Sequence, residues 1–329
     1  MKRWPDTWKI AAGDSINCKS ASWTVAFLSS NSRNFPARGQ SMANGSAGDS
    51  EKAPRPGSPD QPPQAQPILQ EPPPNPNGGR TLIVDAVDPA AYPRPSAAVN
   101  EAGPEDQVFI RPGRYEDKLF VSERPILLIG AGRDVVQIFS RRGGPLYLQR
   151  VPNGRISGIT FRYVGSDQNS AMNILDSTCT IAACRATEGI LSGVVIYGPD
   201  CRPTLIDNEV CHNRESGIFS FAGARPYLAQ NHCFENHHFG LAVRDEGTQP
   251  DLVRNVCRDN MLSGILLFHN AEAMVLSNIC RDNQHWGLVT TPECTTSPPR
   301  EELAAANQLD ANPRGAICVT KEPLSEIGR

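Results

Sequence analysis

Four consecutive segments of the chain repeat one pattern: an Asn, a second Asn five residues later, and a Gly four residues after that. The copies begin at Pro203, Pro226, Pro250 and Ala273, so the period is 23 or 24 residues. A short, fixed period is typical of a solenoid, in which each repeat packs only against its neighbours. The repeat therefore constrains the fold before any single side chain is interpreted.

Each repeat has room for short strands but not for a helix. The runs after each Gly are brief, apolar and alternating, as in GIFSF, GLAVR and GILLF. Strands that recur in the same order, without a crossover helix, can pair in parallel only by coiling, with a rise of ~4.8 Å per coil. The sequence therefore predicts an all-β fold, a single-stranded parallel β-helix.

The two Asn positions form columns in such a coil. We predict that inward-turned amides stack into ladders that satisfy buried polar groups along the axis. A second interpretation, that Asn is used for its tolerance of left-handed turns, stays open for at least one column. The predicted structural ladder consists of Asn208, Asn231, Asn255 and Asn278 in one column and Asn213, Asn236, Asn260 and Asn283 in the other.

A column of small apolar residues follows the first Asn by two positions. Val210, Cys233, Cys257 and Cys280 occupy it and should pack in the core. The chain has ten Cys but no CxxC pair, so we favour core packing over zinc sites or disulfides and predict no metal and no cofactor. Cysteines used in this way favour a reducing compartment, and we expect a cytoplasmic protein.

The repeat decays at both ends, as terminal repeats do. An earlier copy has Cys184 and Gly189 at the Asn positions, and a later copy from Asn307 shortens the distance to Gly315 by one. Upstream, strand-like TLIV and QVFIRPGRY and a short helix at SAAVNEA should cap the coil. The predicted β-helix domain spans 80–320, with a cap at 80–140, regular coils at about 150–290, a degenerate last coil at 304–320 and a tail at 321–329.

Residues 1–79 have a different composition. Between Lys52 and Asn77, ten of 26 residues are Pro, so this segment cannot bury a core and is predicted to be a disordered tail or linker. PDQP and PPNP have the PxxP form that SH3-type domains bind, although any tract so rich in Pro contains such matches. SWTVAFLSS from Ser22 lacks a good cleavage site, which argues against secretion, and Met42 is a plausible start.

The overall charge excludes some function classes. The formal net charge is -3 with 20% charged residues, which argues against a nucleic-acid partner. No run approaches the ~18 apolar residues that a membrane span needs.

Residues 203–290 resemble the β-helix repeats of the F-box-only ubiquitin-ligase adaptors. They are also similar, more loosely, to right-handed β-helix proteins of the carbohydrate-binding and sugar-hydrolysis type. The shared features are the PxLxxNxxxxNxxxG skeleton and strands that end in Phe221, Arg244 and Phe268. The stretch from Thr81 resembles the amino-terminal cap of such helices. The resemblance implies a right-handed coil and a binding or sugar-active role, but residues 1–79 show no F-box pattern.

The strand after each Gly should present its second and fourth residues outward. These columns are apolar, with one Arg between two Phe, which is unusual for a free surface. Either the chain covers this face with its Pro-rich segment or with the insertion TTPECTTSPPREELAAA, or the face binds a peptide or a sugar through aromatic and cationic groups. The predicted binding residues are Tyr197, Phe219, Phe221, Arg244 and Phe268.

A second candidate region is the turn that carries stacked carboxylates. Carboxylates one coil apart beside Arg residues suit a polyuronate lyase or epimerase, and they could hold Ca²⁺ under that alternative. A solvated charge ladder at a turn is the other interpretation. No catalytic residue is assigned, and the weak candidates are Asp259, Asp282, Arg258, Arg281 and His285.

We therefore expect a non-catalytic recognition module or scaffold, with a protein partner favoured over a glycan. The alternative is a polysaccharide lyase, hydrolase or epimerase that acts on a polyuronate-like polymer. The absence of GxSxG, P-loop and HExxH motifs excludes several other enzyme classes.

Overall fold

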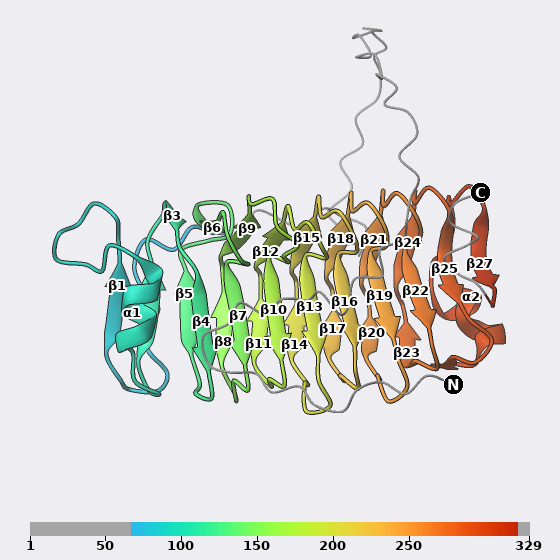
Figure 1. Ribbon diagram of the computed structural model, residues 1–329, viewed down its shortest axis with the longest axis horizontal. Helices are drawn as coiled ribbons and strands as arrows, with labels where there is room; N and C mark the ends of the chain where they lie inside the picture. The colour runs from blue at the N-terminus through green and yellow to red at the C-terminus, as the bar shows by residue number, and fades with distance from the viewer. Residues whose placement is uncertain (1–66, 322–329) are drawn as a thin grey trace, which may run out of the picture. The chain divides into compact units, whose positions relative to one another are not determined.

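The computed structural model describes residues 67–321, which form one parallel β-helix (Figure 1). Each regular coil contributes one strand to each of three sheets, and equivalent strands of successive coils pair in parallel and in register. The predicted fold class is confirmed. We call the three sheets A, B and C.

The strands of each sheet follow the order of the coils. Sheet A contains β1 (Thr81–Val84), β2 (Gln107–Ile110), β5 (Leu127–Gly130), β8 (Arg155–Ser157), β11 (Thr180–Ala182), β14 (Thr204–Ile206), β17 (Tyr227–Ala229), β20 (Asp251–Val253), β23 (Glu272–Leu276) and β26 (Thr295–Ser297). Sheet B contains β3 (Gly113–Glu116), β6 (Val136–Ser140), β9 (Thr160–Tyr163), β12 (Arg185–Thr187), β15 (Glu209–Cys211), β18 (His232–Phe234), β21 (Val256–Arg258) and β24 (Ile279–Arg281). Sheet C contains β4 (Leu119–Ser122), β7 (Leu146–Gln149), β10 (Met172–Leu175), β13 (Val194–Tyr197), β16 (Ile218–Phe221), β19 (Leu241–Arg244), β22 (Ile265–Phe268), β25 (Trp286–Thr290) and β27 (Gly315–Val319).

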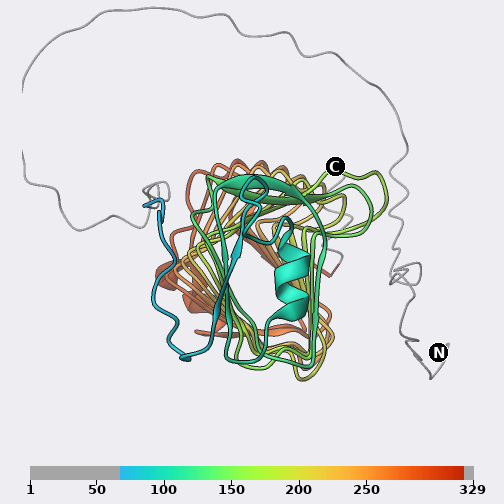
Figure 2. The same ribbon diagram turned by 90° about the vertical axis from the view of Figure 1, so that its left-hand side faces the viewer.

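Helices are short and lie near the ends of the coil. Helix α1 (Pro95–Glu101) starts with Pro at its first position, packs against β1, β2 and β4, and lies across the amino-terminal end of the coil (Figure 2). At the other end, η2 (Arg300–Glu302) and α2 (Leu303–Ala306) follow β26, and the fully buried Leu303 joins the core. The predicted cap helix is therefore present.

Inside the coil, equivalent side chains of successive coils stack in columns. Val210, Cys233, Cys257 and Cys280 are paired in register on neighbouring strands of sheet B and have no exposed surface, as predicted. None of the nine cysteines among the described residues forms a disulfide. Because no disulfide joins the coils within residues 67–321, apolar burial along the axis is the main stabilising contribution to this core.

The Asn side chains form two continuous ladders. Asn231 is representative, because its Oδ1 accepts from the amide N and Nδ2 of Asn208, at 3.1 and 2.9 Å, while its Nδ2 donates to Leu205 O and Asn255 Oδ1, at 2.9 and 3.0 Å. Every hydrogen-bonding position of the amide is therefore filled. The ladders extend beyond the regular repeats to Asn307 and Asn312.

The alternative explanation of the Asn columns is wrong. The residue before each ladder Asn, and not the Asn itself, has the left-handed backbone, as at Asp207 (φ 54°), Gln230 (φ 55°) and Arg254 (φ 53°). That conformation turns the corner between sheets. It leaves the following Asn free to point its amide inward.

Gly is required in this column because the next coil lies too close for a side chain. A Cβ on Gly264 would lie 2.6 Å from Gly287 O and 2.8 Å from Cys280 Sγ, and Gly240 faces Cys257 in the same way. No side chain fits between the Gly position and the thiol of the next coil.

Two segments differ from their sequence-based assignment. Residues 67–79 were predicted to be part of the tail, but Leu69 N donates to Ala131 O at 2.8 Å and Pro73 O accepts from the Gln107 amide at 2.9 Å. These contacts hold the segment against the first coils. The insertion from Thr290 supplies β26, which extends sheet A, so it does not cover the outer face of sheet C. The SWTVAFLSS and PDQP segments lie outside the described residues.

Candidate functional site

The outer face of sheet C carries the predicted binding residues. Register places Asn173, Val195, Phe219, Ala242, Leu266 and Val289 in one outward column. A second outward column contains Leu175, Tyr197, Phe221, Arg244 and Phe268. Both columns run along the axis of the coil, so the face combines side chains that are far apart in the sequence.

Four of the five predicted residues form one aromatic and cationic cluster. The rings of Tyr197 and Phe221 stack with centroids 5.5 Å apart, and those of Phe219 and Phe221 are 4.9 Å apart. The Arg244 guanidinium lies 5.3 and 5.2 Å from the ring centroids of Phe219 and Phe221, within cation–π distance. Its Nε is 3.1 Å from Asp245 Oδ1, in a geometry that makes an ion pair but not a hydrogen bond.

The fifth residue, Phe268, differs from the prediction of an open aromatic surface. Phe268 is only 8% exposed and belongs to a hydrophobic cluster separate from the core, together with Phe239, Ala242, Leu266 and Val289. Neighbouring coils place large side chains side by side on this face, so the central ones are shielded. Tyr197, Phe219 and Phe221 are half-buried and form the more accessible part of the face.

Titratable residues border the face at the turn between sheets B and C. Backbone hydrogen bonds from His238 N to Glu215 O (3.0 Å) and from His285 N to Leu262 O (2.8 Å) align them in one column. Burial raises the pKa of Glu215, and burial lowers the pKa values of His238 and His285. Glu215 therefore keeps its proton to a higher pH than an exposed carboxyl group does.

The weak catalytic candidates lie at the corner where sheet B ends. Asp259 and Asp282 are exposed, have left-handed backbones (φ 55° each), and each pairs at 2.5 Å with the Arg that precedes it, Arg258 or Arg281. Each carboxylate is thus neutralised within its own coil. This geometry is that of a solvated charge ladder. No group of three or more His, Cys, Asp or Glu residues within 67–321 has the arrangement of a metal site.

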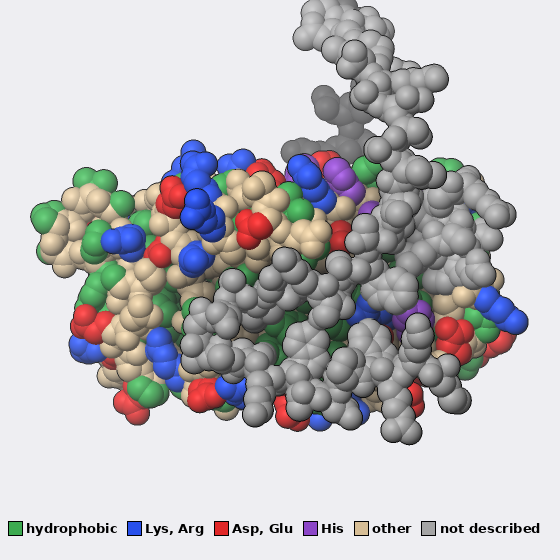
Figure 3. Space-filling model, viewed as in Figure 1, with side chains coloured by type: hydrophobic (Ala, Val, Ile, Leu, Met, Phe, Trp, Pro, Cys, Tyr) green, Lys and Arg blue, Asp and Glu red, His purple; other side chains and the backbone are tan. Residues whose placement is uncertain are grey.

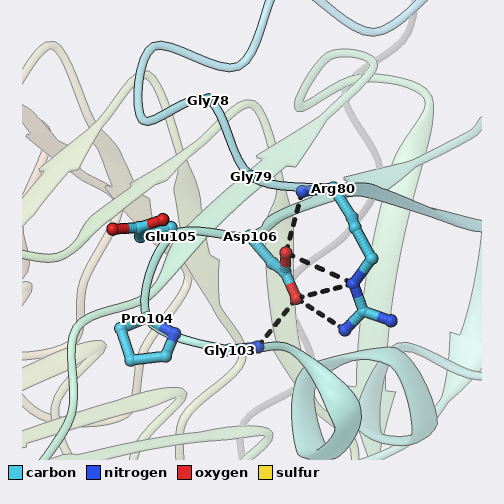
Figure 4. A pocket seen from close by; sticks show the side chains of 7 residues that line it. All are labelled: Gly78, Gly79, Arg80, Gly103, Pro104, Glu105 and Asp106. Atoms are coloured by element: carbon cyan, nitrogen blue, oxygen red, sulfur yellow. Dashed lines mark hydrogen bonds and ion pairs between the residues drawn. The ribbon is translucent and has the colours of Figure 1, made fainter.

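One pocket within residues 67–321 lies at the amino-terminal cap, beside β1 and the loop after α1. It is lined by Gly78–Arg80 and Gly103–Asp106 and has a volume of about 570 Å³ (Figure 4). Its Asp106 carboxylate accepts from Arg80 N at 2.8 Å, Arg80 Nη2 at 2.7 Å and Gly103 N at 2.9 Å, and these donors lower the pKa of Asp106 to about 2. These hydrogen bonds join the start of β1 to the loop after α1, and the pocket lies between these two segments.

Two further properties concern the surface charges and the helices. Basic and acidic side chains are interspersed along the edges of the view in Figure 3, as expected for a chain with little net charge. Among residues 67–321, none of the helices has the length and hydropathy to cross a membrane.

Sequence reasoning missed the polar end of the face. Asn173 lies one coil before Val195 and two coils before Phe219 in the outward column. Ser170 and Ser192 lie two residues before the first inward residues of β10 and β13, Met172 and Val194. Phe239 and Trp286 hold the equivalent positions in later coils. The signal was the register itself, which continues upstream of the regular Asn–Gly pattern. Extending the alignment by one coil would have placed these residues on sheet C.

Comparison with known proteins finds one family model that matches the region of the repeats. Residues 146–296 match the family described as a right handed beta helix region, which agrees with the predicted resemblance to right-handed β-helix proteins and with the predicted handedness. No curated protein sequence matches the chain.

Similar solved structures include a pectate lyase, Pel9A, with 15% identity, a TM-score of 0.41 and coverage of 63% of this chain and 56% of that one. The catalytic domain of a GH87 alpha-1,3-glucanase, in complex with tetrasaccharides, has 14% identity, a TM-score of 0.40 and coverage of 69% and 46%. The Azotobacter vinelandii mannuronan C-5 epimerase AlgE6 A-module has 12% identity, a TM-score of 0.34 and coverage of 68% and 92%. The chain thus spans about half the length of the first two, and likeness at this level carries no argument about activity.

Proposed function

We propose that this β-helix is a recognition module that binds a protein partner through the outer face of sheet C. The proposal rests on the cluster of Tyr197, Phe219, Phe221 and Arg244, which three successive coils bring into direct contact. Aromatic and Arg side chains contribute most of the binding energy at many protein interfaces. The resemblance of the repeats to those of F-box-only adaptors favours a protein over a glycan as the partner.

The test is to select binders from a random 12-residue peptide library on the full chain and to measure their dissociation constants by fluorescence anisotropy. Phe221→Ala and Arg244→Gln should each weaken binding at least about ten-fold, because each removes one member of the stacked cluster. Tyr227→Ala is the matched control, since Tyr227 is an exposed aromatic residue on sheet A (39% exposed). A library without binders, or equal affinities for all three variants, would refute the proposal.

A sugar-active enzyme is the second candidate, and Glu215 is the observation that favours it. A partly buried carboxyl group with a raised pKa suits a general acid. Release of unsaturated or reducing ends from polygalacturonate and alginate, with and without Ca²⁺, measures this activity. Activity that Glu215→Gln abolishes, or Ca²⁺-dependent activity that Asp259→Asn with Asp282→Asn abolishes, would replace the recognition module by an enzyme.

A further inference from the structure

Residues 67–74 lie over the first coils of sheet A, on its outer face. We call this segment, PILQEPPP, the strap (blue trace in Figure 2). Leu69 N donates to Ala131 O, just after β5, at 2.8 Å, and Pro73 O accepts from the side-chain amide of Gln107, the first residue of β2, at 2.9 Å. This face therefore already binds one proline-rich segment of the chain.

The strap covers only the first part of an apolar outward column. Register places Phe109 in this column, and Phe109 has no exposed surface, as expected for a residue beneath the strap. From β1 to β23 the column holds Ile83, Phe109, Ile129, Ser157, Ala182, Ile206, Ala229, Val253 and Leu276. Beyond the strap the face is accessible, since Leu276 is 42% exposed and Tyr227, in the neighbouring and more polar column, is 39% exposed. An accessible column with Ser157 as its one polar member is unusual for a free surface.

A hollow of about 310 Å³ lies at the far end of this face, beside β20, β23 and β26. Its lining includes Asp251, Glu272 and Met274, and no Lys or Arg of the described residues. Glu272 accepts a hydrogen bond from the uncharged amide of Gln249 at 2.9 Å. The hollow therefore combines two carboxylates with an apolar side chain and suits a Lys or Arg side chain.

The chain before the strap has the length and composition to continue over this face. Followed backwards, the strap advances from β2 to β5, and Pro67 lies against Gly132 at the corner after β5. Residues 55–66, RPGSPDQPPQAQ, lie outside the described residues, contain four Pro and begin with Arg55. Six coil steps from β5 to β23 are roughly 29 Å, and about twelve residues of polyproline conformation span roughly 37 Å, so this segment is long enough to reach the hollow.

We infer that residues 55–66 continue the strap along the outer face of sheet A and place Arg55 in the hollow, beside Asp251 and Glu272. The Pro side chains cover the apolar column, and the guanidinium pairs with the two carboxylates. The inference concerns sheet A alone and does not depend on the proposed function.

The other two outer faces suit this segment less well. On sheet B, the outward Arg185 and Glu209 already pair with each other. On sheet C, the Arg244 guanidinium lies over the aromatic rings, so a second Arg there would meet a like charge. Of the two sequence-based interpretations of the sheet C face, coverage by the Pro-rich segment is therefore the one that the inference removes.

Photo-cross-linking in the full chain tests the position of the segment. p-Benzoylphenylalanine replaces Tyr227 on sheet A or, as the matched control, Phe221 on sheet C, and mass spectrometry after digestion maps the cross-linked residues. We expect the probe at position 227 to cross-link to residues 55–66 of the same chain, and the probe at position 221 not to do so. A mixture of isotope-labelled and unlabelled chains distinguishes links within one chain from links between two.

Charge reversal tests the place of Arg55. Asp251→Lys with Glu272→Lys should lower the yield of the cross-link from position 227 about three- to ten-fold, because the hollow then repels the guanidinium. Arg55→Glu in the same chain should restore the yield. Asp259→Lys with Asp282→Lys changes the net charge equally at the exposed turn and should leave the yield unchanged.

Three results would overturn the inference. Cross-links to residues 55–66 from position 221 would mean that the segment covers sheet C, and cross-links only between two chains would mean that the occupant is a second copy. A yield at position 227 that charge reversal does not change would remove Arg55 from the hollow. A peptide library without binders on a chain that still cross-links at position 227 would refute the proposed function and leave this inference standing.

Discussion

Inside the coil, the two ladder positions hold Asn in all four regular repeats, whereas one outward column of sheet C changes from Asn through Val, Phe, Ala and Leu to Val. The inner positions repeat because each Asn must match the coils before and after it. The outer positions are not constrained in this way by the neighbouring coils. Repetition in this chain therefore marks structure, and variation marks the surface where recognition is proposed.

The comparison also explains why an Asn on one side of the wall is not equivalent to an Asn on the other. Asn255 Oδ1 accepts two hydrogen bonds from Asn231, and Asn255 Nδ2 donates to Leu228 O and Asn278 Oδ1. The Nδ2 of Asn173 on sheet C has no partner. The Asn255 amide is fully hydrogen-bonded to the neighbouring coils, whereas the Asn173 amide has an unpaired nitrogen.

Replacing a ladder Asn should produce the largest effect. Asn255→Ala leaves the polar groups of both neighbouring coils unpaired in the core, so we expect a loss of at least about 3 kcal/mol in the free energy of unfolding. Asn173→Ala is the matched control and should change this free energy by less than about 1 kcal/mol. Urea unfolding measures both, and equal losses would remove the distinction between inner and outer positions.

The Gly column should show the next largest effect. Gly264→Ala forces a Cβ against Gly287 O and Cys280 Sγ and should cost about 1–3 kcal/mol. Gly103→Ala, where the nearest atom lies 3.5 Å from the added Cβ, should stay within about 0.5 kcal/mol of the wild type. Similar midpoints of urea unfolding for the two variants would contradict the steric explanation.

Acid should weaken the coil through partly buried imidazoles. Burial lowers the pKa of His232 to about 4, against an ordinary value of 6.5, while Asp207 opposes the shift and Arg258 and Arg133 add to it. Between pH 6.5 and 4 the unfolded chain binds a proton that the folded chain does not, so stability is complete above pH 6.5 and declines as the pH falls.

His232→Gln should therefore make the fall in melting temperature between pH 7 and 4.5 shallower. A residual slope should persist, because burial also lowers the pKa values of His237, His238 and His285. Melting curves at several pH values measure the slope, and an unchanged slope would show that His232 titrates normally.

The smallest effect is expected at the exposed turn. Asp259→Asn removes an exposed ion pair with Arg258 but suits the left-handed backbone, so the free energy of unfolding should change by less than about 0.5 kcal/mol. A loss above about 2 kcal/mol in urea unfolding would show that the turn carboxylates take part in the internal structure.

The repeat was sufficient to predict the coil, the ladders and the thiol column, because these follow from identical residues stacking at a fixed period. The state of the outer face was harder to predict. Alternation correctly placed Phe268 on the outward side, but its 8% exposure depends on neighbours from other coils. The pairing of Asp282 with Arg281 depends on backbone conformation at the turn, which the sequence pattern does not specify.

A crystal structure of the full chain with a selected peptide tests the central claim most directly. The account predicts a peptide on the outer face of sheet C, in contact with Phe221 and Arg244. A peptide bound to sheet A, to sheet B or at the turn of Asp259 and Asp282 would contradict it.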